Sequence, residues 1–281
     1  MNRISTHFLD FEGIKTAYYS TEGEGTPIVL LHGGGVDHAM LSWKTIMQTW
    51  TGSQPLVALD LPGYGNSDKP ELEYSLSFYT GFLNAFLDTL NAQNVTLCGL
   101  SMGGAIALQY ALRYPNYIGK LVLVAPWGVS ASAPYSLMGR LLVRLPLNQV
   151  VYKTLQNRWL AKNIIAGSLI GNREKITPEI LDEVQTAAHS KDAARVFQSF
   201  QISELWGEPP VGHLIPLLPQ IKVPTLFIQG DKDPGVKVGD VKQAAASMPN
   251  TRVEIFEHHK HWVQKESPER FVDIVRDFIE S

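Results

Sequence analysis

The sequence predicts an α/β fold in which helices flank a mostly parallel sheet and a helical cap is inserted before the last strands. Five short runs of Val, Ile and Leu support the sheet, at residues 27–31, 55–60, 95–100, 120–125 and 224–229. Their apolar residues are continuous rather than alternating, which is typical of parallel strands buried on both faces. Helical patterns lie between the runs, and one long segment contains no such run.

The helical patterns between the strands are clearest from Leu76 to Leu90 and from Ala105 to Arg113. Strands that alternate with helices predict a doubly wound sheet. The opening segment, HFLDFEGIKTAYYSTEGEG, alternates more strongly and contains Gly turns. We therefore expect an antiparallel hairpin at one edge of the sheet.

The segment of residues 130–217 interrupts this rhythm. It contains helix-like pieces, SLMGRLLVRL, QVVYKTLQNRWLAKNII and TPEILDEVQTAA, and in the last of these Thr177 is a good N-cap. An all-helical segment between two sheet strands is best explained as a cap over the strand ends, where open α/β sheets bind ligands. We predict a core of residues 1–129 and 218–281 with a helical cap of residues 130–217.

The composition restricts the partners and the compartment. A net charge of −3 and a pI near 6.2 argue against nucleic acid as a ligand. The N-terminus lacks the apolar region of a signal peptide, and no stretch reaches the ~18 consecutive apolar residues of a membrane span. The single cysteine, Cys98, cannot form an internal disulfide. We expect a soluble, cytoplasmic protein with no membrane partner and no metal or cofactor, and a homodimer stays open.

A serine between a strand and a helix is the strongest chemical signal. The sequence GLSMGG, residues 99–104, follows the strand VTLCGL and precedes AIALQYALRY. Such a turn is tight and needs small flanking residues, which Gly99 and Gly103 supply. The turn lifts the hydroxyl above the sheet at a helix N-terminus, where backbone amides and the helix dipole favour a developing negative charge. Ser101 is the predicted nucleophile.

Three glycines follow the first of the predicted parallel strands. Gly33, Gly34 and Gly35 would let backbone amides approach a substrate closely. One such amide, together with the amide of the residue after the nucleophile, would hold an oxyanion. We predict the N–H groups of Gly34 and Met102 as donors, with Gly33 and Gly35 lining the substrate site. The preceding His32 is expected to be structural.

A serine nucleophile needs a neutral histidine that takes its proton. In this kind of fold the histidine comes last along the chain, which excludes early candidates such as His7. His258, His259 and His261 all lie in the loop after the strand RVEIF. His261 is the predicted base because it is nearest the following helix, with His259 as the main alternative.

The carboxylate that orients the histidine should lie just beyond the end of a strand. Asp231 and Asp233 both follow PTLFIQG. We predict Asp233, because the turn after Gly230 lets its side chain reach back under the histidine, and we expect Asp231 to bond turn amides. Asp60 and Asp68, in DLPGYGNSD, are interpreted as turn-stabilising residues.

Taken together, LLHGGG, DLPGYGNSD, GLSMGG, FIQGDKDP and HHKHW resemble the α/β-hydrolase superfamily over nearly the whole chain. The resemblance implies an eight-stranded sheet and a Ser-Asp-His triad. HGGG, SMGGA, RYPNYIGKLVL and the His-Trp pair look most like the meta-cleavage product hydrolases, which cut a carbon–carbon bond in ring-fission products, and the carboxylesterases grouped with them.

Four positions depart from the carbon–carbon hydrolases that the chain resembles. Those enzymes typically carry an Asn in the oxyanion loop, an Asn before the nucleophile and a cap Arg that grips the substrate carboxylate, and the corresponding places here are Trp43, Leu100 and Val184. Lys260 stands where they usually have Gly. A buried substrate carboxylate without its Arg would be costly. We therefore rank first a less polar substrate, a carboxylic ester or a related thioester or lactone, cleaved through an acyl-enzyme.

Two other functions stay open at this point. One is a carbon–carbon bond hydrolase that acts on a ring-fission product. The other is a ligand-binding receptor built on the same fold, in which the triad turns over slowly. Nucleophilic attack by Asp, as in epoxide hydrolysis, is disfavoured because Ser101 occupies the turn.

The predicted pocket accommodates an apolar acyl or aryl group beside Leu100, Trp127 and Trp262. Most of the remaining large apolar side chains of the cap are expected to pack the cap onto the core. These are Leu137, Met138, Leu141, Leu142, Leu145, Trp159, Phe197, Phe200 and Trp206.

Overall fold

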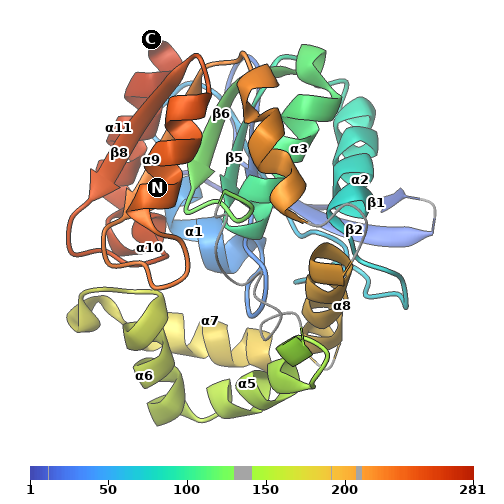
Figure 1. Ribbon diagram of the computed structural model, residues 1–281, viewed down its shortest axis with the longest axis vertical. Coiled ribbons are helices and arrows are strands. Elements are labelled where there is room, and N and C mark those ends of the chain that lie inside the picture. The colour runs from blue at the N-terminus through green and yellow to red at the C-terminus, as the bar shows by residue number, and fades with distance from the viewer. Residues whose placement is uncertain (12, 130–140, 191, 207–210) are drawn as a thin grey trace.

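One eight-stranded sheet organises the chain (Figure 1). The structure is a computed structural model and describes residues 1–281 except 12, 130–140, 191 and 207–210. The strands lie in the order β1-β2-β4-β3-β5-β6-β7-β8. Their bounds are β1 Ser5–Phe11, β2 Ile14–Ser20, β3 Ile28–Leu31, β4 Leu56–Leu59, β5 Val95–Leu100, β6 Ile118–Val124, β7 Thr225–Gly230 and β8 Thr251–Phe256.

Antiparallel pairing is confined to the pairs made by β1 and β2. Strand β1 pairs with β2, and β2 pairs with β4, in antiparallel register, whereas every neighbouring pair from β4 to β8 is parallel. The predicted mostly parallel sheet and the opening edge hairpin are both confirmed.

Alternate residues of the parallel strands enter two separate hydrophobic cores. Val29 and Leu31 pack in the core that contains α2 (Leu76–Thr89), α3 (Met102–Arg113) and α9 (Val238–Ser247). Ile28 and Leu30 pack in the core that contains α1 (Ala39–Thr49) and α11 (Pro268–Glu280). Successive strand side chains point to opposite faces. Both faces are therefore covered, which explains why the strand sequences are apolar without alternation.

Helices alone occupy the described chain between β6 and β7. They are α5 (Leu147–Leu155), α6 (Arg158–Ser168), α7 (Pro178–Ala188) and α8 (Ala193–Trp206), with short 3₁₀ turns at Arg173–Lys175 and Val211–Gln220. Figure 1 shows α5, α6 and α7 beyond the end of the sheet toward which the parallel strands point. The structure therefore places helices over the strand ends, while the domain boundaries at 130 and 217 stay a prediction.

Two helix starts in this segment depend on side-chain caps. Thr177 accepts a hydrogen bond from the Ile180 amide at 3.3 Å and starts α7, as predicted. The piece QVVYKTLQNRWLAKNII, expected as one helical stretch, is divided at Asn157. The Asn157 side chain accepts from the Leu160 amide at 3.1 Å and starts α6. Asn is a favoured N-cap because its short side chain competes for backbone amides.

Helix α8 attaches the inserted helices to the core. The Glu204 carboxylate accepts a hydrogen bond of 2.5 Å from the Leu76 amide at the start of α2. The Ser199 hydroxyl accepts from the Tyr74 amide at 3.1 Å. Burial raises the pKa of Glu204 to about 7, although the hydrogen bond from Leu76 opposes that rise.

Part of the predicted packing of the inserted helices is wrong. Leu141, Leu142, Leu145 and Trp159 are exposed, Trp159 by 71%. Helical spacing identifies an apolar face but cannot say what covers it, and here the inward positions are taken by other residues. Phe200 is buried as expected. Leu137 and Met138 lie outside the described residues.

Two further short helices complete the fold. A 3₁₀ turn at Pro115–Tyr117 comes just before β6, and α10 (Val263–Glu266) lies between β8 and α11. Among the described helices, none has the length and apolar character needed to cross a bilayer.

Candidate active site

Ser101 occupies a strained turn between β5 and α3. Its backbone has φ 52° and ψ −111°, a conformation that side-chain-bearing residues rarely adopt. A Cβ on Gly99 would lie 2.3 Å from the Gly103 carbonyl oxygen, and one on Gly103 would lie 2.5 Å from the Leu31 carbonyl oxygen. The two glycines predicted to flank the serine are therefore required by space.

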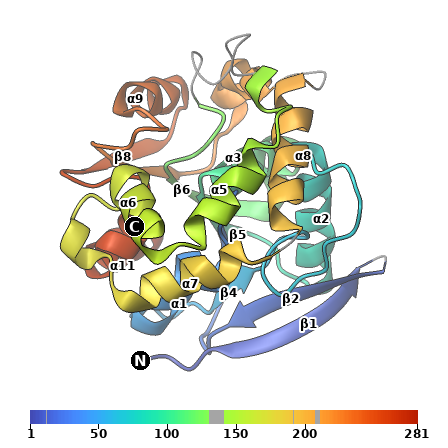
Figure 2. The same cartoon turned by 90° about the horizontal axis from the view of Figure 1, so that it is seen from below.

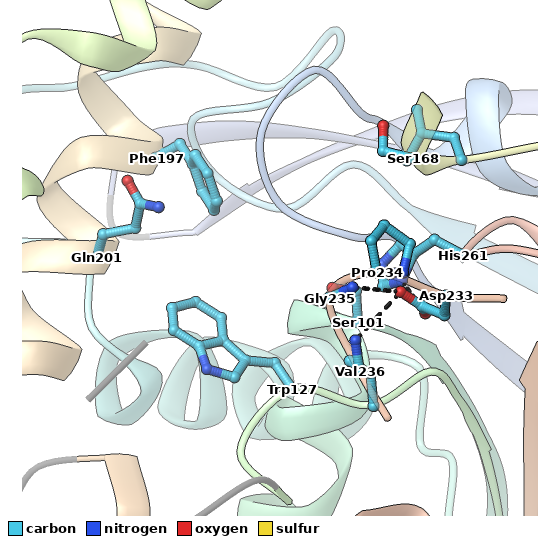
Figure 3. A pocket seen from close by; sticks show the side chains of 11 residues that line it. Ser101, Trp127, Ser168, Phe197, Gln201, Asp233, Pro234, Gly235, Val236 and His261 are labelled. Carbon is cyan, nitrogen blue, oxygen red and sulfur yellow. Dashed lines mark hydrogen bonds and ion pairs between the residues drawn. The ribbon is translucent and has the colours of Figure 1, made fainter. Parts of the chain in front are cut away.

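His261 and Asp233 form the pair that was predicted from sequence. The Nδ1 atom of His261 lies 2.6 Å from Oδ2 of Asp233. The other carboxylate oxygen accepts from the amides of Gly235 at 2.8 Å and Val236 at 3.1 Å (Figure 3). Burial raises the pKa of Asp233, but the bonds from His261 and the two amides outweigh burial and hold it below its usual value. The carboxylate therefore stays ionised beside the imidazole.

The neighbouring candidates have other partners. Both ring nitrogens of His259 are engaged, Nδ1 with the Glu257 carbonyl at 2.7 Å and Nε2 with the Ser267 hydroxyl at 2.6 Å. His259 is therefore half-buried, and neither of its ring nitrogens is left to act on Ser101. His258 is exposed, and Asp231 forms an ion pair with Lys232 at 3.2 Å.

Gln229 is a site residue that sequence reasoning missed. It is fully buried at the end of β7, and its Nε2 donates to Asp233 Oδ2 at 3.1 Å. The same amide group donates to the carbonyl oxygens of Gly230 at 3.2 Å and Val236 at 3.0 Å. All three partners are acceptors, which fixes the orientation of the amide. Gln229 therefore holds the turn that carries Asp233 and shares the oxygen bound by His261.

Ser101 and His261 line the same cavity. The hydrogen bonds of the described residues do not include one between Ser101 Oγ and His261 Nε2. Hydrogen bonds of this kind are often long until a substrate is bound. The cavity therefore brings together the three groups that proton transfer from a serine requires, a hydroxyl, an imidazole and a carboxylate, and the last two are hydrogen-bonded.

The glycine loop lies directly against Ser101. A Cβ on Gly33 would lie 3.5 Å from the Ser101 Cβ, and one on Gly34 would lie 2.4 Å from the Phe197 ring and 3.3 Å from the Met102 sulfur. Gly35 has φ 77°, which favours glycine. Met102 is the first residue of α3, so its amide has no partner within the helix.

Buried polar side chains fix the glycine loop. The Asp37 carboxylate, missed from the sequence, accepts from the Gly33 amide at 2.8 Å and from the Ser42 hydroxyl at 2.8 Å. His32 is fully buried and donates through Nδ1 to the Gly33 carbonyl at 2.7 Å, while its Nε2 accepts from the Leu61 amide at 3.1 Å. Burial lowers the pKa of His32, so a neutral, structural ring is present, as expected.

The two aspartates interpreted as turn-stabilising residues do bond backbone amides. Asp60 accepts from the amides of Ala39 and Asn66, both at 2.8 Å. Asp68 accepts from the Lys15 amide at 2.9 Å. Neither lines the cavity that contains Ser101.

Comparison with known proteins identifies the family. The family model for the alpha/beta hydrolase fold matches residues 26–268. The chain belongs to the alpha/beta hydrolase fold family. This hydrolase is 27% identical over 271 residues to 2-hydroxy-6-oxo-6-phenylhexa-2,4-dienoate hydrolase of Comamonas testosteroni, covering 93% of this chain and 90% of that protein.

Two further comparisons extend the likeness. An uncharacterised protein of Mycobacterium tuberculosis, Rv2715, is 29% identical over 278 residues, covering 92% of this hydrolase and 76% of that protein. Among solved structures, a membrane phospholipase A described as a bacterial virulence factor superposes with a TM-score of 0.81 at 26% identity, covering 99% of this chain and 86% of that one.

Two cavities meet at Ser101 and His261 of the hydrolase. The larger, of about 450 Å³, lies between Trp127, Phe197 and the turn that carries Asp233 (Figure 3). The smaller, of about 180 Å³, is lined by the four other residues predicted to bind substrate. These are Gly33, Gly35, Leu100 and Trp262, so all five predicted substrate-binding residues lie in one cavity or the other.

Polar residues from the inserted helices reach both cavities, and nothing in the sequence singled them out. Gln201 of α8 lines the larger cavity and Asn148 of α5 lines the smaller one. The Asn148 amide donates to the Gln201 carbonyl oxygen at 2.7 Å. Helical periodicity places both on inward faces, but their pairing depends on how α5 and α8 pack.

Acidic side chains outnumber basic ones in the walls of the two cavities. The ionisable residues that line the two cavities, among the described part of the chain, are Asp37, Tyr152, Asp233 and His261. No Lys or Arg of the described residues contributes to either wall. A substrate carboxylate placed here would meet carboxylates and apolar groups rather than a cation.

Proposed function

We propose that this hydrolase cleaves a neutral carboxylic ester, or a related acyl compound, through an acyl-enzyme formed on Ser101. The observation that carries the proposal is the hydroxyl at the strained turn, beside the His261 and Asp233 pair, in a cavity whose described walls carry no cation. The substrate is a small molecule with an apolar acyl or aryl group.

The proposed reaction starts with proton transfer. His261 takes the Ser101 proton as the oxygen attacks the ester carbonyl, and Asp233 stabilises the imidazolium that forms. His261 then gives the proton to the leaving alcohol. Water, activated by the same imidazole, releases the acid from Ser101.

The oxyanion of the tetrahedral intermediate would accept from the amides of Gly34 and Met102. Each donor of this kind contributes about 2.7–4 kcal/mol to transition-state stabilisation. The packing of Gly34 against the Phe197 ring and the Met102 side chain supports this assignment, because it keeps the loop close to the nucleophile.

A neutral ester is preferred because of electrostatics. An unpaired carboxylate in such a cavity costs several kcal/mol, since nothing replaces its lost hydration. The likeness to a phospholipase A at 26% identity also favours acyl ester chemistry. Helices α5 to α8 would act as the cap that excludes water from the acyl-enzyme.

The test is hydrolysis of p-nitrophenyl esters of two to twelve carbons by the wild type and by Ser101→Ala. We expect turnover of at least one chain length and a loss on the order of 10⁶-fold in kcat in the variant. Equal release of p-nitrophenol by both proteins would overturn the proposal.

The second candidate is carbon–carbon bond hydrolysis. It is favoured by the 27% identity over 93% of the chain to a dienoate hydrolase, and it would use the same serine and histidine. The decisive assay offers the synthetic 6-phenyl dienoate to the wild type and follows loss of its visible absorbance. Turnover faster than that of any simple ester would replace the ester proposal with this one.

A further inference from the structure

We propose that the outer surface of residues 141–159 binds an anionic phospholipid surface. Six large apolar side chains are exposed on this surface, here called the basic apolar face: Leu141, Leu142, Leu145, Leu147, Val150 and Trp159. Val150 is 59% exposed and Trp159 is 71% exposed. Monomeric proteins seldom expose large apolar groups so close together without a partner. Figure 2 shows α5 and α6 on the side of the molecule turned toward the viewer.

Helix α5 carries apolar side chains on more than one side. Tyr152 and Leu155 are buried, and Val151 lines the smaller cavity at Ser101, whereas Leu147 and Val150 are exposed and line neither of the two cavities. The spacing i, i+3 makes Leu147 and Val150 neighbours on the helix surface. A helix that is already packed through one side does not need the second apolar side for folding. The outer side is therefore available to a partner.

The charge of the segment identifies the partner. The sequence contains no Asp or Glu from residue 89 to residue 173, yet residues 141–173 contain five basic side chains. They are Arg144, Lys153, Arg158, Lys162 and Arg173. The local excess of positive charge is not evident from the whole chain, whose net charge is −3. Apolar side chains flanked by Lys and Arg are typical of helices that lie in the interface of anionic lipids.

The basic residues differ in how far they are already neutralised. Arg158 pairs with Asp182 of α7, and Arg144 stacks on the Trp206 ring at 3.8 Å. Lys153 is exposed on α5, beside the apolar side chains. A second copy of the chain fits poorly, because an isologous contact would bring the same positive charges together. A lipid surface supplies both the negative charge and the apolar layer.

Docking through the basic apolar face would bring lipid close to the cavities at Ser101, and this step rests on the proposed function. A hollow of about 120 Å³ between Leu142, Leu145 and Leu147 is also lined by Asn148 and Gln201. Gln201 lines the larger cavity at Ser101, and Asn148 lines the smaller one. A docked bilayer would present acyl chains at this hollow, next to both cavities. The expectation of no membrane partner was drawn from spanning segments, and surface binding requires none.

The first test is co-sedimentation with vesicles of phosphatidylcholine alone and of phosphatidylcholine mixed with phosphatidylglycerol. We expect binding to the anionic vesicles only, weakened by high salt. The double variant Lys153→Glu/Lys162→Glu should bind at least ~25-fold more weakly, because each basic residue contributes a roughly five-fold gain. Lys242→Glu, on exposed α9, is the matched control and should bind like the wild type.

A second measurement locates the contact. Lipids with brominated acyl chains should quench tryptophan fluorescence in the wild type and should quench it much less in Trp159→Phe. Leu147→Ser/Val150→Ser should lose vesicle binding, whereas Phe8→Ser, at a 49% exposed residue of β1, should keep it. Hydrolysis of a water-soluble p-nitrophenyl ester is measured in parallel and should be unchanged in all these variants, which separates this inference from the proposed function.

Three results would overturn the inference. One is equal sedimentation with neutral and anionic vesicles. Another is an equal loss of binding in Lys242→Glu and in the double lysine variant. The third is an ultracentrifugation experiment in which the wild type is a dimer without lipid and Leu147→Ser/Val150→Ser is a monomer, since the face would then be an interface between copies.

Discussion

At the scale of single residues, the geometry of the site depends on side chains that orient the catalytic side chains. Asp233 binds His261 through one oxygen and its own turn through the other. Gln229 shares the first of these oxygens. The orientation of the imidazole is therefore set by a buried network rather than by one ion pair, and each member can be tested separately.

Asp233→Asn should reduce kcat/KM for a p-nitrophenyl ester by about 10⁴-fold, because the amide would hold His261 in the wrong tautomer. The asparagine carbonyl oxygen can still accept from Gly235 and Val236, but its amide nitrogen would face the Gln229 donor, so the thermal midpoint should fall without loss of the fold. Asp231→Asn, at a carboxylate that bonds Lys232 and the His258 backbone rather than His261, is the control and should remain within two-fold of the wild type. Equal losses in both variants would mean that the acid has been misassigned.

Gln229→Leu should lower kcat about ten-fold, since a hydrogen bond to a charged group contributes about 1.5–3 kcal/mol. Because Gln229 acts through Asp233 rather than on the substrate, the loss should appear in kcat and not in KM. An unchanged kcat would show that Gln229 only supports the fold.

The residue scale also shows what the sequence could and could not predict. Ser101 was predictable because the strand, the glycines and the helix around it are all local. Asp233 and His261 required a choice among neighbours, which the hydrogen bonds now favour. Gln201 could not be found, because its partner Asn148 lies on another helix and no local pattern encodes how the two helices pack. Asp37 and Gln229 bond groups within seven residues of themselves, but the turns that bring those groups into reach have no distinctive sequence pattern.

At the scale of elements, α8 attaches the inserted helices to the core. It carries Glu204 into a buried position at the first turn of α2. A carboxylate there gains from the helix N-terminus but loses its hydration. The stability of this contact should therefore depend on pH.

Glu204→Gln should stabilise the protein at pH 8 and have little effect at pH 4. Burial raises the folded-state pKa of Glu204 to about 7, above the ordinary value of 4.5. The contribution of Glu204 is therefore complete below pH 4.5 and is lost as the pH rises through 7, by up to about 3 kcal/mol. Chemical denaturation at both pH values measures the difference. A destabilised variant at pH 8 would show that the ionised form is the stabilising one.

Element prediction succeeded where local signals and burial agree. The run at 95–100 and the Thr177 cap gave correct bounds for β5 and the start of α7. The apolar residues near 141–159 were misjudged, because periodicity reports an apolar side and not its partner. These residues are instead exposed, and their exposure is the basis for proposing that the basic apolar face binds lipid.

At the scale of the whole molecule, the cavity walls should select substrates by charge. Mono-p-nitrophenyl succinate has the acyl length of p-nitrophenyl butyrate but ends in a carboxylate. Its kcat/KM should be lower by at least ~100-fold, because an unpaired buried charge costs roughly 3–5 kcal/mol. Asp37 and Asp233 add repulsion from the cavity walls. Comparable values for the two esters would mean that a cation reaches the acyl group.

The most direct test of the central claim, that Ser101 is the acylated nucleophile, is peptide mass spectrometry after treatment with an alkyl p-nitrophenyl phosphonate. We predict one adduct, on the peptide that contains Ser101, which forms much more slowly in His261→Ala and is absent from Ser101→Ala. An adduct on another residue, or equal labelling of Ser101→Ala, would contradict it.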